Sequence, residues 1–178
     1  MATTITEALA ELATIDKRLD KKARDISPYV ARLDLVRDPL ERNGGSAKYI
    51  TEERQSFGDL LKRKIALRAA IAKSNAETAL PTLDEKMSVA DWLVWKRECY
   101  SHQKTMLNSL LSQARNARSE AQKQGVNIVS ASEQGRPNDI VVNVDEQRII
   151  EELEELEELY GRLDGLLSLK NATTTIEV

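Results

Sequence analysis

The sequence has very few of the residues that build covalent frameworks and reactive sites. It contains one cysteine, Cys99, and one histidine, His102. A single cysteine excludes an intramolecular disulfide framework and a cysteine-rich zinc site. Aromatic residues make up only 4% of the chain. Leucine and alanine must therefore supply most of the packing, which favours helices over a β-sandwich.

Long apolar runs and a strong net charge are also missing. No apolar run approaches the ~18 residues that span a bilayer, and residues 1–10 show no secretory signal. We therefore expect a soluble protein, made in the cytoplasm, with no membrane partner. The net charge of -3 creates no overall field that would attract nucleic acid or an anionic membrane.

No combination of residues indicates catalysis. Cys99 and His102 are one helical turn apart, but side chains in the middle of a helix lack the turn that exposes a nucleophile, and no further partners converge on them. Residues 44–46 lack the lysine of a phosphate-binding loop, and the glutamates of residues 151–158 lack the ligand spacing of a calcium loop. The sequence predicts no enzyme, no small-molecule substrate, no cofactor and no metal site.

What the sequence does contain is a long helical pattern from Ser88 to Gly125. Ser88 and Asp91 form a capping box at its start, and Gly125 is suited to a left-handed C-cap at its end. No glycine or proline lies between them, so we expect one helix. Trp92 and Trp95 are three residues apart on this helix, which predicts a packed core or a docking site.

Other helices precede this one. The capping box Thr4–Glu7 begins a helix that runs to Ile26. Ser27 and Pro28 then mark either a kink or a short helix over residues 29–37. Residues 43–46, Asn-Gly-Gly-Ser, form the strongest turn signal in the chain. A second long helix is expected over 47–78, and it forms a helical hairpin with the first.

After Gly125 the pattern changes to a period of two. Residues 126–129 and 140–144 are rich in β-branched side chains and flank a polar loop, which predicts a β-hairpin over 126–144. A lone hairpin is marginally stable in water, so it must lie on the helices or on another subunit. The tail, residues 171–178, is strand-like in composition and suits addition to a sheet edge.

The last helix, residues 145–170, has the best heptad pattern of the chain. It contains nine acidic and three basic residues, whereas residues 88–125 contain six basic and three acidic ones. We therefore expect this acidic helix to pack against the basic one, with Arg115, Arg118 and Lys123 facing it. Its heptad positions are Ile149, Leu153, Leu156, Tyr160, Leu163 and Leu167.

Together these patterns predict a mainly α protein, a long-helix bundle or coiled coil with three long helices and a short one, then a β-hairpin before the last helix and a strand-like C-terminal tail. We expect one domain overall. Its parts are a helical hairpin plus the long helix (1–125), the β-hairpin (126–144), the acidic heptad helix packed on the bundle (145–170) and the extended tail (171–178).

Three stretches carry a resemblance to a known group. ITEALAEL with IDKRL near the start, RNGGSAKYITEERQSFGDL in the middle and SVADWLVWKRE resemble small, poorly characterised helical proteins encoded by tailed bacteriophages. The resemblance covers residues 3–100. It implies a virion-associated or assembly role and supplies no active-site residues.

The leading hypothesis is a non-enzymatic structural or assembly protein of a tailed phage particle, at the head-to-tail connector or attached to the capsid. It would act through helix packing and strand exchange between subunits. Its partners would be further copies of itself and other virion proteins, and it would pass from the host cytoplasm into the virion. The side chains expected to make these contacts are Trp92, Trp95, Arg115, Arg118, Lys123, Ile149, Leu153, Leu156, Tyr160, Leu163, Leu167, Ile176 and Val178.

Two alternatives remain open. A coiled-coil scaffolding protein or host-protein adaptor would bind its target through the Trp92 face. A nucleic-acid-binding helical protein would use a basic stripe that includes residues 62–64 and 96–97, with Arg115, Arg118 and Lys123. The acidic last helix and the lack of a recognition module count against nucleic acid.

Overall fold

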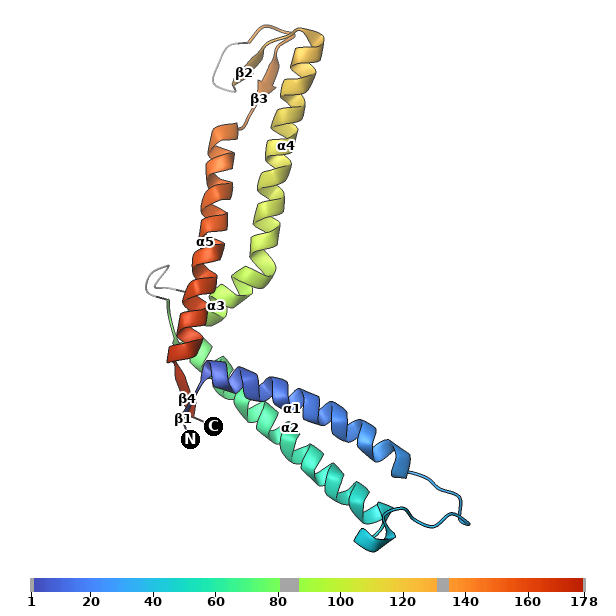
Figure 1. Ribbon diagram of the computed structural model, residues 1–178. Helices are drawn as coiled ribbons and strands as arrows, with labels where there is room; N and C mark the ends of the chain where they lie inside the picture. The colour runs from blue at the N-terminus through green and yellow to red at the C-terminus, as the bar shows by residue number, and fades with distance from the viewer. Residues whose placement is uncertain (1, 81–86, 131–134, 178) are drawn as a thin grey trace. The chain divides into compact units, whose positions relative to one another are not determined.

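The computed structural model describes residues 2–80, 87–130 and 135–177, and the chain is mainly helical, as predicted (Figure 1). The α-helices are α1 (Ile5–Ile26), α2 (Ser46–Glu77), α3 (Val89–Val94), α4 (Tyr100–Gln124) and α5 (Glu146–Thr173). Two short 3-10 helices, η1 (Ser27–Tyr29) and η2 (Glu41–Asn43), and a π-helix, η3 (Trp95–Cys99), complete the helical elements. The strands are β1 (Ala2–Thr4), β2 (Ile128–Ser130), β3 (Ile140–Val142) and β4 (Thr175–Glu177).

The contacts of the chain group into two compact units, where the sequence predicts one domain. Unit 1 comprises residues 1–78 and 168–178, and unit 2 comprises residues 79–167. Helix α5 contributes its first part to unit 2 and its last turns to unit 1. Each unit has its own apolar core, so each is described separately.

Unit 1 is built on a hairpin of α1 and α2. The predicted capping box is present, because the Glu7 backbone N–H donates to Thr4 Oγ1 (3.2 Å) and the Thr4 N–H donates to the Glu7 carboxylate (2.8 Å). The buried side chains of α1 recur every three or four residues, the period of a helix face. They pack with two residues of α2 and one of β4 to form a core of Ile5, Ala8, Leu12, Ile15, Leu19, Leu67, Ile71 and Ile176.

The connection between α1 and α2 is irregular. Helix α1 is followed by the single 3-10 turn η1, which contains Pro28, and residues 31–37 form no helix. The short helix suggested for residues 29–37 is therefore wrong. The predicted turn is present, with Gly44 and Gly45 at φ 94° and 89°, where the absence of a Cβ removes the steric penalty.

The C-terminal tail forms a strand, as predicted. Strand β4 pairs antiparallel with β1, and Ile176 lies opposite Thr3. The Ile5 N–H also donates to the Thr174 carbonyl (3.0 Å). The tail therefore pairs with the N-terminal strand of its own chain. Val178 lies outside the described residues.

Unit 2 contains the long helical pattern, which is helical from Val89 to Gln124 but not uniformly α. The start is the predicted capping box of Ser88 and Asp91, and the end is Gly125 at φ 65°. Between them η3 is π-helical, and the Tyr100 N–H donates to the Trp95 carbonyl five residues earlier. The prediction of one regular helix is wrong at this segment, and Figure 1 shows the chain bending between α3 and α4.

The two strands after α4 do not form the predicted β-hairpin. Strands β2 and β3 pair in parallel, with Ile128 opposite Ile140. A tight turn precedes β3, in which the Asp139 N–H donates to the Arg136 carbonyl (3.0 Å) and the Arg136 N–H donates to the Asp139 carboxylate (2.7 Å). Parallel strands cannot be joined by the tight turn of an antiparallel hairpin, so the hairpin prediction is wrong.

Helix α5 packs on α4 within unit 2, as the charge pattern predicts. The seam is formed by Leu107 and Leu111 of α4 with Ile149 of α5. Ion pairs that cross from the basic segment to the acidic helix include Lys96–Asp164, Lys104–Glu157 at 2.7 Å and Arg118–Glu146 at 2.5 Å. Among the helices of the described ranges, none combines the length and apolarity required to cross a membrane.

Candidate functional site

Trp92 lies in the core of unit 2 and not on its surface. Its side chain is 6% exposed and packs in a cluster that includes Val89, Leu163 and Leu167. Of the two roles predicted for it, a packed core or a docking site, the structure shows the packed core. An adaptor that docks through the Trp92 face would therefore find this ring already covered.

The second tryptophan begins a row of aromatic rings. Trp95 is half-buried, contacts the Trp92 ring edge-to-face with centroids 5.7 Å apart, and donates a hydrogen bond from Nε1 to Gln103 (3.0 Å). Tyr100 follows at 5.9 Å from Trp95 and stacks at 4.2 Å on Tyr160 of α5. These contacts link η3 to α5 through rings instead of aliphatic packing.

The three predicted basic residues of α4 have different surroundings. Arg118 pairs with Glu146 of the acidic helix, whereas Lys123 pairs at 4.0 Å with Glu120 of its own helix. Arg115 makes no ion pair within the described residues. Only Arg118 therefore meets the acidic helix as expected.

Two cations that were not predicted from the sequence contact α5: Lys96 and Lys104. The hydrogen bond to Glu157 raises the pKa of Lys104 above its ordinary value. The ion pairs follow the pattern of two antiparallel helices, because residues with higher numbers in the basic segment meet residues with lower numbers on α5. The charged residues are visible in the sequence, but assigning each pair requires knowing that the two helices pack together and in which register.

The six heptad side chains of α5 all lie on its packed face. Ile149, Leu163 and Leu167 are buried, and Leu153, Leu156 and Tyr160 are half-buried. Ile176 of β4 is likewise buried, in the core of unit 1. These residues therefore stabilise the chain's own fold.

The basic stripe considered for nucleic acid is largely paired with acidic residues. Arg63 contacts Glu11 and Lys64 contacts Asp16, at 2.7 and 2.5 Å. Lys62 lies 3.5 Å from Asp59. Phosphate groups would have to compete with these carboxylates, which weakens the case for a nucleic-acid surface.

A groove lies between α4 and α5. Its volume is about 300 Å³. Met106 and Leu107 of α4 and Leu156 and Leu159 of α5 supply its apolar lining, while Gln103, Glu152 and Glu155 supply its polar lining. Met106 is 55% exposed, so this apolar surface is open to solvent.

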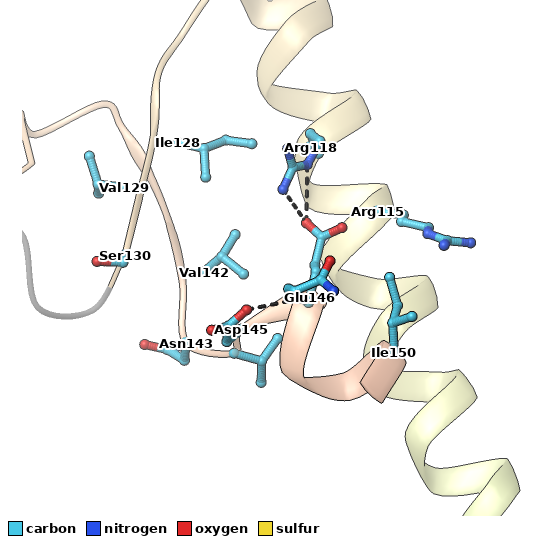
Figure 2. A pocket seen from close by; sticks show the side chains of 12 residues that line it. Arg115, Arg118, Ile128, Val129, Ser130, Val142, Asn143, Asp145, Glu146 and Ile150 are labelled. Carbon is cyan, nitrogen blue, oxygen red and sulfur yellow. Dashed lines mark hydrogen bonds and ion pairs between the residues drawn. The ribbon is translucent and has the colours of Figure 1, made fainter. Parts of the chain in front are cut away.

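A larger cavity of about 1000 Å³ lies between the β2–β3 pair, α4 and the start of α5 (Figure 2). The Arg118–Glu146 pair lies within it. Asp145 caps α5 by accepting hydrogen bonds from the backbone N–H groups of Gln147 (2.9 Å) and Arg148 (3.3 Å). The acidic residues that line this cavity, Asp145 and Glu146, therefore already have partners within the same chain.

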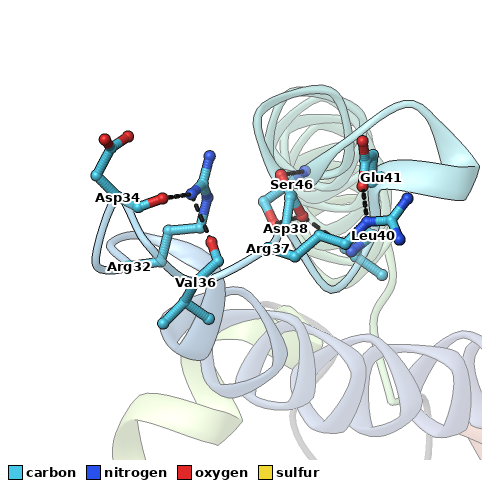
Figure 3. Close-up of polar contacts among 8 residues, drawn as sticks. All are labelled: Arg32, Asp34, Val36, Arg37, Asp38, Leu40, Glu41 and Ser46. Atoms are coloured by element: carbon cyan, nitrogen blue, oxygen red, sulfur yellow. Dashed lines mark hydrogen bonds and ion pairs between the residues drawn. The ribbon is translucent and has the colours of Figure 1, made fainter.

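The loop after η1 displays apolar side chains, and we call residues 30–37 the tip loop. Val30, Leu33, Leu35 and Val36 are 69%, 76%, 100% and 51% exposed. The guanidinium of Arg32 holds the loop by donating to the backbone carbonyls of residues 33, 34 and 36, the last at 2.7 Å (Figure 3). Three backbone carbonyls of the loop thus have a partner within the loop, while its apolar side chains face solvent.

The polypeptide that follows the tip loop is fixed by Asp38. Its carboxylate accepts hydrogen bonds from the Leu40 N–H (2.8 Å) and from both the N–H (2.8 Å) and the hydroxyl (2.6 Å) of Ser46, at the start of α2 (Figure 3). The hydrogen bonds from Ser46 and Leu40 hold the pKa of Asp38 below its ordinary value. An Arg37–Glu41 ion pair adds a further link.

Cys99 and His102 are both exposed on the helical surface of unit 2. Within the described ranges, no group of three or more histidine, cysteine, aspartate or glutamate side chains is placed to hold a metal ion. The arrangements that stand out are therefore surfaces: the groove, the cavity beside β2–β3 and the tip loop.

The fold and these surfaces define a mainly α protein of two helical units. No protein-family model matches the chain, and no curated protein matches it. A solved structure, the crystal structure of a functionally unknown conserved protein from Corynebacterium diphtheriae, is 19% identical. The match covers 99% of this chain and 100% of that chain, with a TM-score of 0.48. A likeness of this size supports no inference about function.

Proposed function

We propose that this chain is a non-enzymatic structural or assembly protein of a tailed phage particle, at the head-to-tail connector or on the capsid, that works by contacting other proteins. The observation that carries the proposal is the exposure of large apolar side chains on both units. These side chains are Leu9, Val30, Leu33, Leu35, Val36, Leu61, Ile65, Val94, Met106, Leu110, Val141 and Leu169.

The exposure follows from the architecture of each unit. A pair of long helices buries one seam of side chains, and apolar residues beside that seam stay in water unless another element covers them. In α2, Leu67 is fully buried while Ile65, two residues away, is 68% exposed. Where several exposed apolar side chains lie in one short segment, as at Val30, Leu33, Leu35 and Val36, they are typical of a surface that binds other proteins.

The phage assignment is supported by the resemblance of residues 3–100 to helical virion-associated proteins. That region contains all of α1 and α2 and the first turns of the long helix of unit 2. The helix surfaces are the more direct route to contacts between chains. Strand exchange between copies would first have to open the β1–β4 pair, which is closed within one chain.

Mass spectrometry of purified particles tests the proposal. Particles of the phage that encodes this chain would be banded by density, washed with nuclease and salt, and analysed for its peptides. We expect the chain in a fixed ratio to the major capsid protein across fractions. An abundant host cytoplasmic protein serves as the contamination control. If the chain follows that control instead of the particles, the virion role is wrong.

A further inference from the structure

We propose that the tip loop of one copy docks into the α4–α5 groove of a second copy, which joins chains head to tail. This inference rests on the proposed function, since it names one partner for a chain that acts through protein contacts. The apolar contributors are Leu33 and Leu35 of the tip loop and Met106, Leu156 and Leu159 of the groove.

The tip loop holds apolar side chains in solvent on a backbone that is fixed by hydrogen bonds. Leucine and valine side chains gain about 1.5–3 kcal/mol each when they are fully buried, so a loop that holds several of them in water forgoes a sizeable stabilisation. Arg32 nevertheless donates to three backbone carbonyls of the loop. Directly after the loop, the Asp38 carboxylate accepts hydrogen bonds from the backbone N–H groups of Leu40 and Ser46 and from the Ser46 hydroxyl. An ordered loop loses less conformational entropy on binding than a flexible loop does.

The groove matches the tip loop in chemistry. Its apolar lining is open to solvent, and Met106 has the flexible side chain that adapts to irregular partners. Glu155 makes no ion pair in the part of the chain that the structure describes, and it lines the groove beside Glu152. Arg37 flanks the tip loop but is paired with Glu41, so the match between the two surfaces rests on their apolar side chains.

The charges of the two units point to a second copy as the occupant. Unit 1, residues 1–78 and 168–178, carries sixteen basic and thirteen acidic side chains, a net of +3. Unit 2, residues 79–167, carries ten basic and sixteen acidic ones, a net of -6. Unit 1 of one copy is therefore attracted to unit 2 of another, which increases the association rate and selects orientation. Because the two surfaces differ, the contact is heterologous and builds rings or filaments.

The experiment measures the mass of the full chain by sedimentation velocity over a wide range of concentration. The tip variant is Leu33→Ser with Leu35→Ser, and the groove variant is Met106→Lys. The matched control is Ile65→Ser, which removes an apolar side chain of comparable exposure (68%) from outside both surfaces. Circular dichroism establishes that all variants keep their helix content.

The wild-type chain and the control should increase in mass with concentration, and less so at high salt. Each surface variant should raise the dissociation constant about 30-fold or more. An equimolar mixture of the two surface variants should form a dimer, because the tip variant keeps an intact groove and the groove variant keeps an intact tip.

A wild-type chain that stays monomeric at every concentration overturns the inference. So do surface variants that associate like the control, or a mixture in which no dimer forms. The docking and the virion role can be refuted independently. Association of the chain without incorporation into particles refutes the proposed function alone. Incorporation of a chain that stays monomeric refutes the docking alone.

Discussion

Arg63 of α2 binds the carboxylate of Glu11 of α1 through two hydrogen bonds, with Nε 2.7 Å from Oε1 and Nη2 3.0 Å from Oε2. The two residues are far apart in sequence, so the pair fixes the register of the α1–α2 hairpin. Both side chains are about two-fifths exposed (40% and 39%). Solvent screening therefore limits what this pair contributes to stability.

Replacing Glu11 by Gln should lower the stability of unit 1 at neutral pH by about 0.5–1 kcal/mol, because the pair is bidentate but partly exposed. The hydrogen bonds from Arg63 lower the pKa of Glu11 from its ordinary value of 4.5. A lowered pKa gives a contribution that is complete above the ordinary value and is lost as the pH falls through the folded-state pKa. Thermal unfolding followed by circular dichroism should therefore show a Tm difference that shrinks in acid.

The control for this pH dependence is Glu77→Gln. Glu77 is exposed and makes no ion pair in the described part of the chain. It should leave the Tm nearly unchanged at either pH. A Tm difference for Glu11→Gln that is equally large in acid would mean that the carboxylate charge is not what stabilises the hairpin.

The β1–β4 pair predicts a role for the tail in folding. Ile176 is 5% exposed and belongs to the core of α1 and α2. Replacing Ile176 by Ala should destabilise unit 1 by about 2 kcal/mol or more, since it removes buried methylene groups and leaves a cavity. Urea unfolding followed by circular dichroism measures this loss.

The neighbouring strand residue Glu177 provides the comparison, because its side chain is exposed. Glu177→Ala should change the free energy of unfolding by no more than about 0.5 kcal/mol. Equal effects of the two substitutions would show that strand pairing, and not burial of Ile176, is what the tail contributes.

Trp92 should be the most sensitive position on the first turns of the unit 2 helix. Trp92→Ala should cost about 3–5 kcal/mol, because the ring is buried against α5 residues such as Leu163. Val94→Ala, at a position 49% exposed, should cost little. Chemical unfolding followed by tryptophan fluorescence of Trp95 reports on this region. A mild effect of Trp92→Ala would mean that the ring is not part of the core.

The π-helix η3 predicts an unusual tolerance to deletion. A π turn accommodates one residue more than an α turn, so deleting the exposed Glu98 from it should restore an α-helix and keep Trp92 and Leu107 facing α5. Deleting Ser109 from α4 should rotate every later residue by roughly 100° relative to Leu107 and break the seam. Thermal unfolding should give a much larger loss of Tm for the Ser109 deletion. Equal losses would contradict the interpretation of η3 as an inserted residue.

Local signals allowed much of the helical structure to be predicted. The capping boxes at Thr4 and Ser88 and the left-handed Gly125 each depend on residues within one turn of one another, so a short stretch contains the whole cause. The heptad of α5 identified its packed face because the spacing of its apolar residues matches the helical period. The opposite charges of α4 and α5 then correctly indicated that these two helices pair.

The candidate surfaces were predicted less well. Whether Trp92 is core or surface depends on what covers it, and Leu163 lies far along the chain. The α4–α5 groove exists only where two helices meet, so neither helix contains it alone. Leu33 and Leu35 are exposed in a loop whose backbone Arg32 contacts, whereas their apolar character by itself is equally compatible with burial.

The sequence by itself determined the mainly α class, most helix ends and the strand character of the tail, because these follow from interactions between near neighbours. The tertiary structure decided that β4 pairs with β1, that β2 and β3 run in parallel, that the long helix contains a π segment and that the contacts form two units. Each of these depends on which distant segments meet. Burial and hydrogen bonding between such segments outweigh local preference, since local propensities amount to less than about 1 kcal/mol per residue and one buried side chain contributes more.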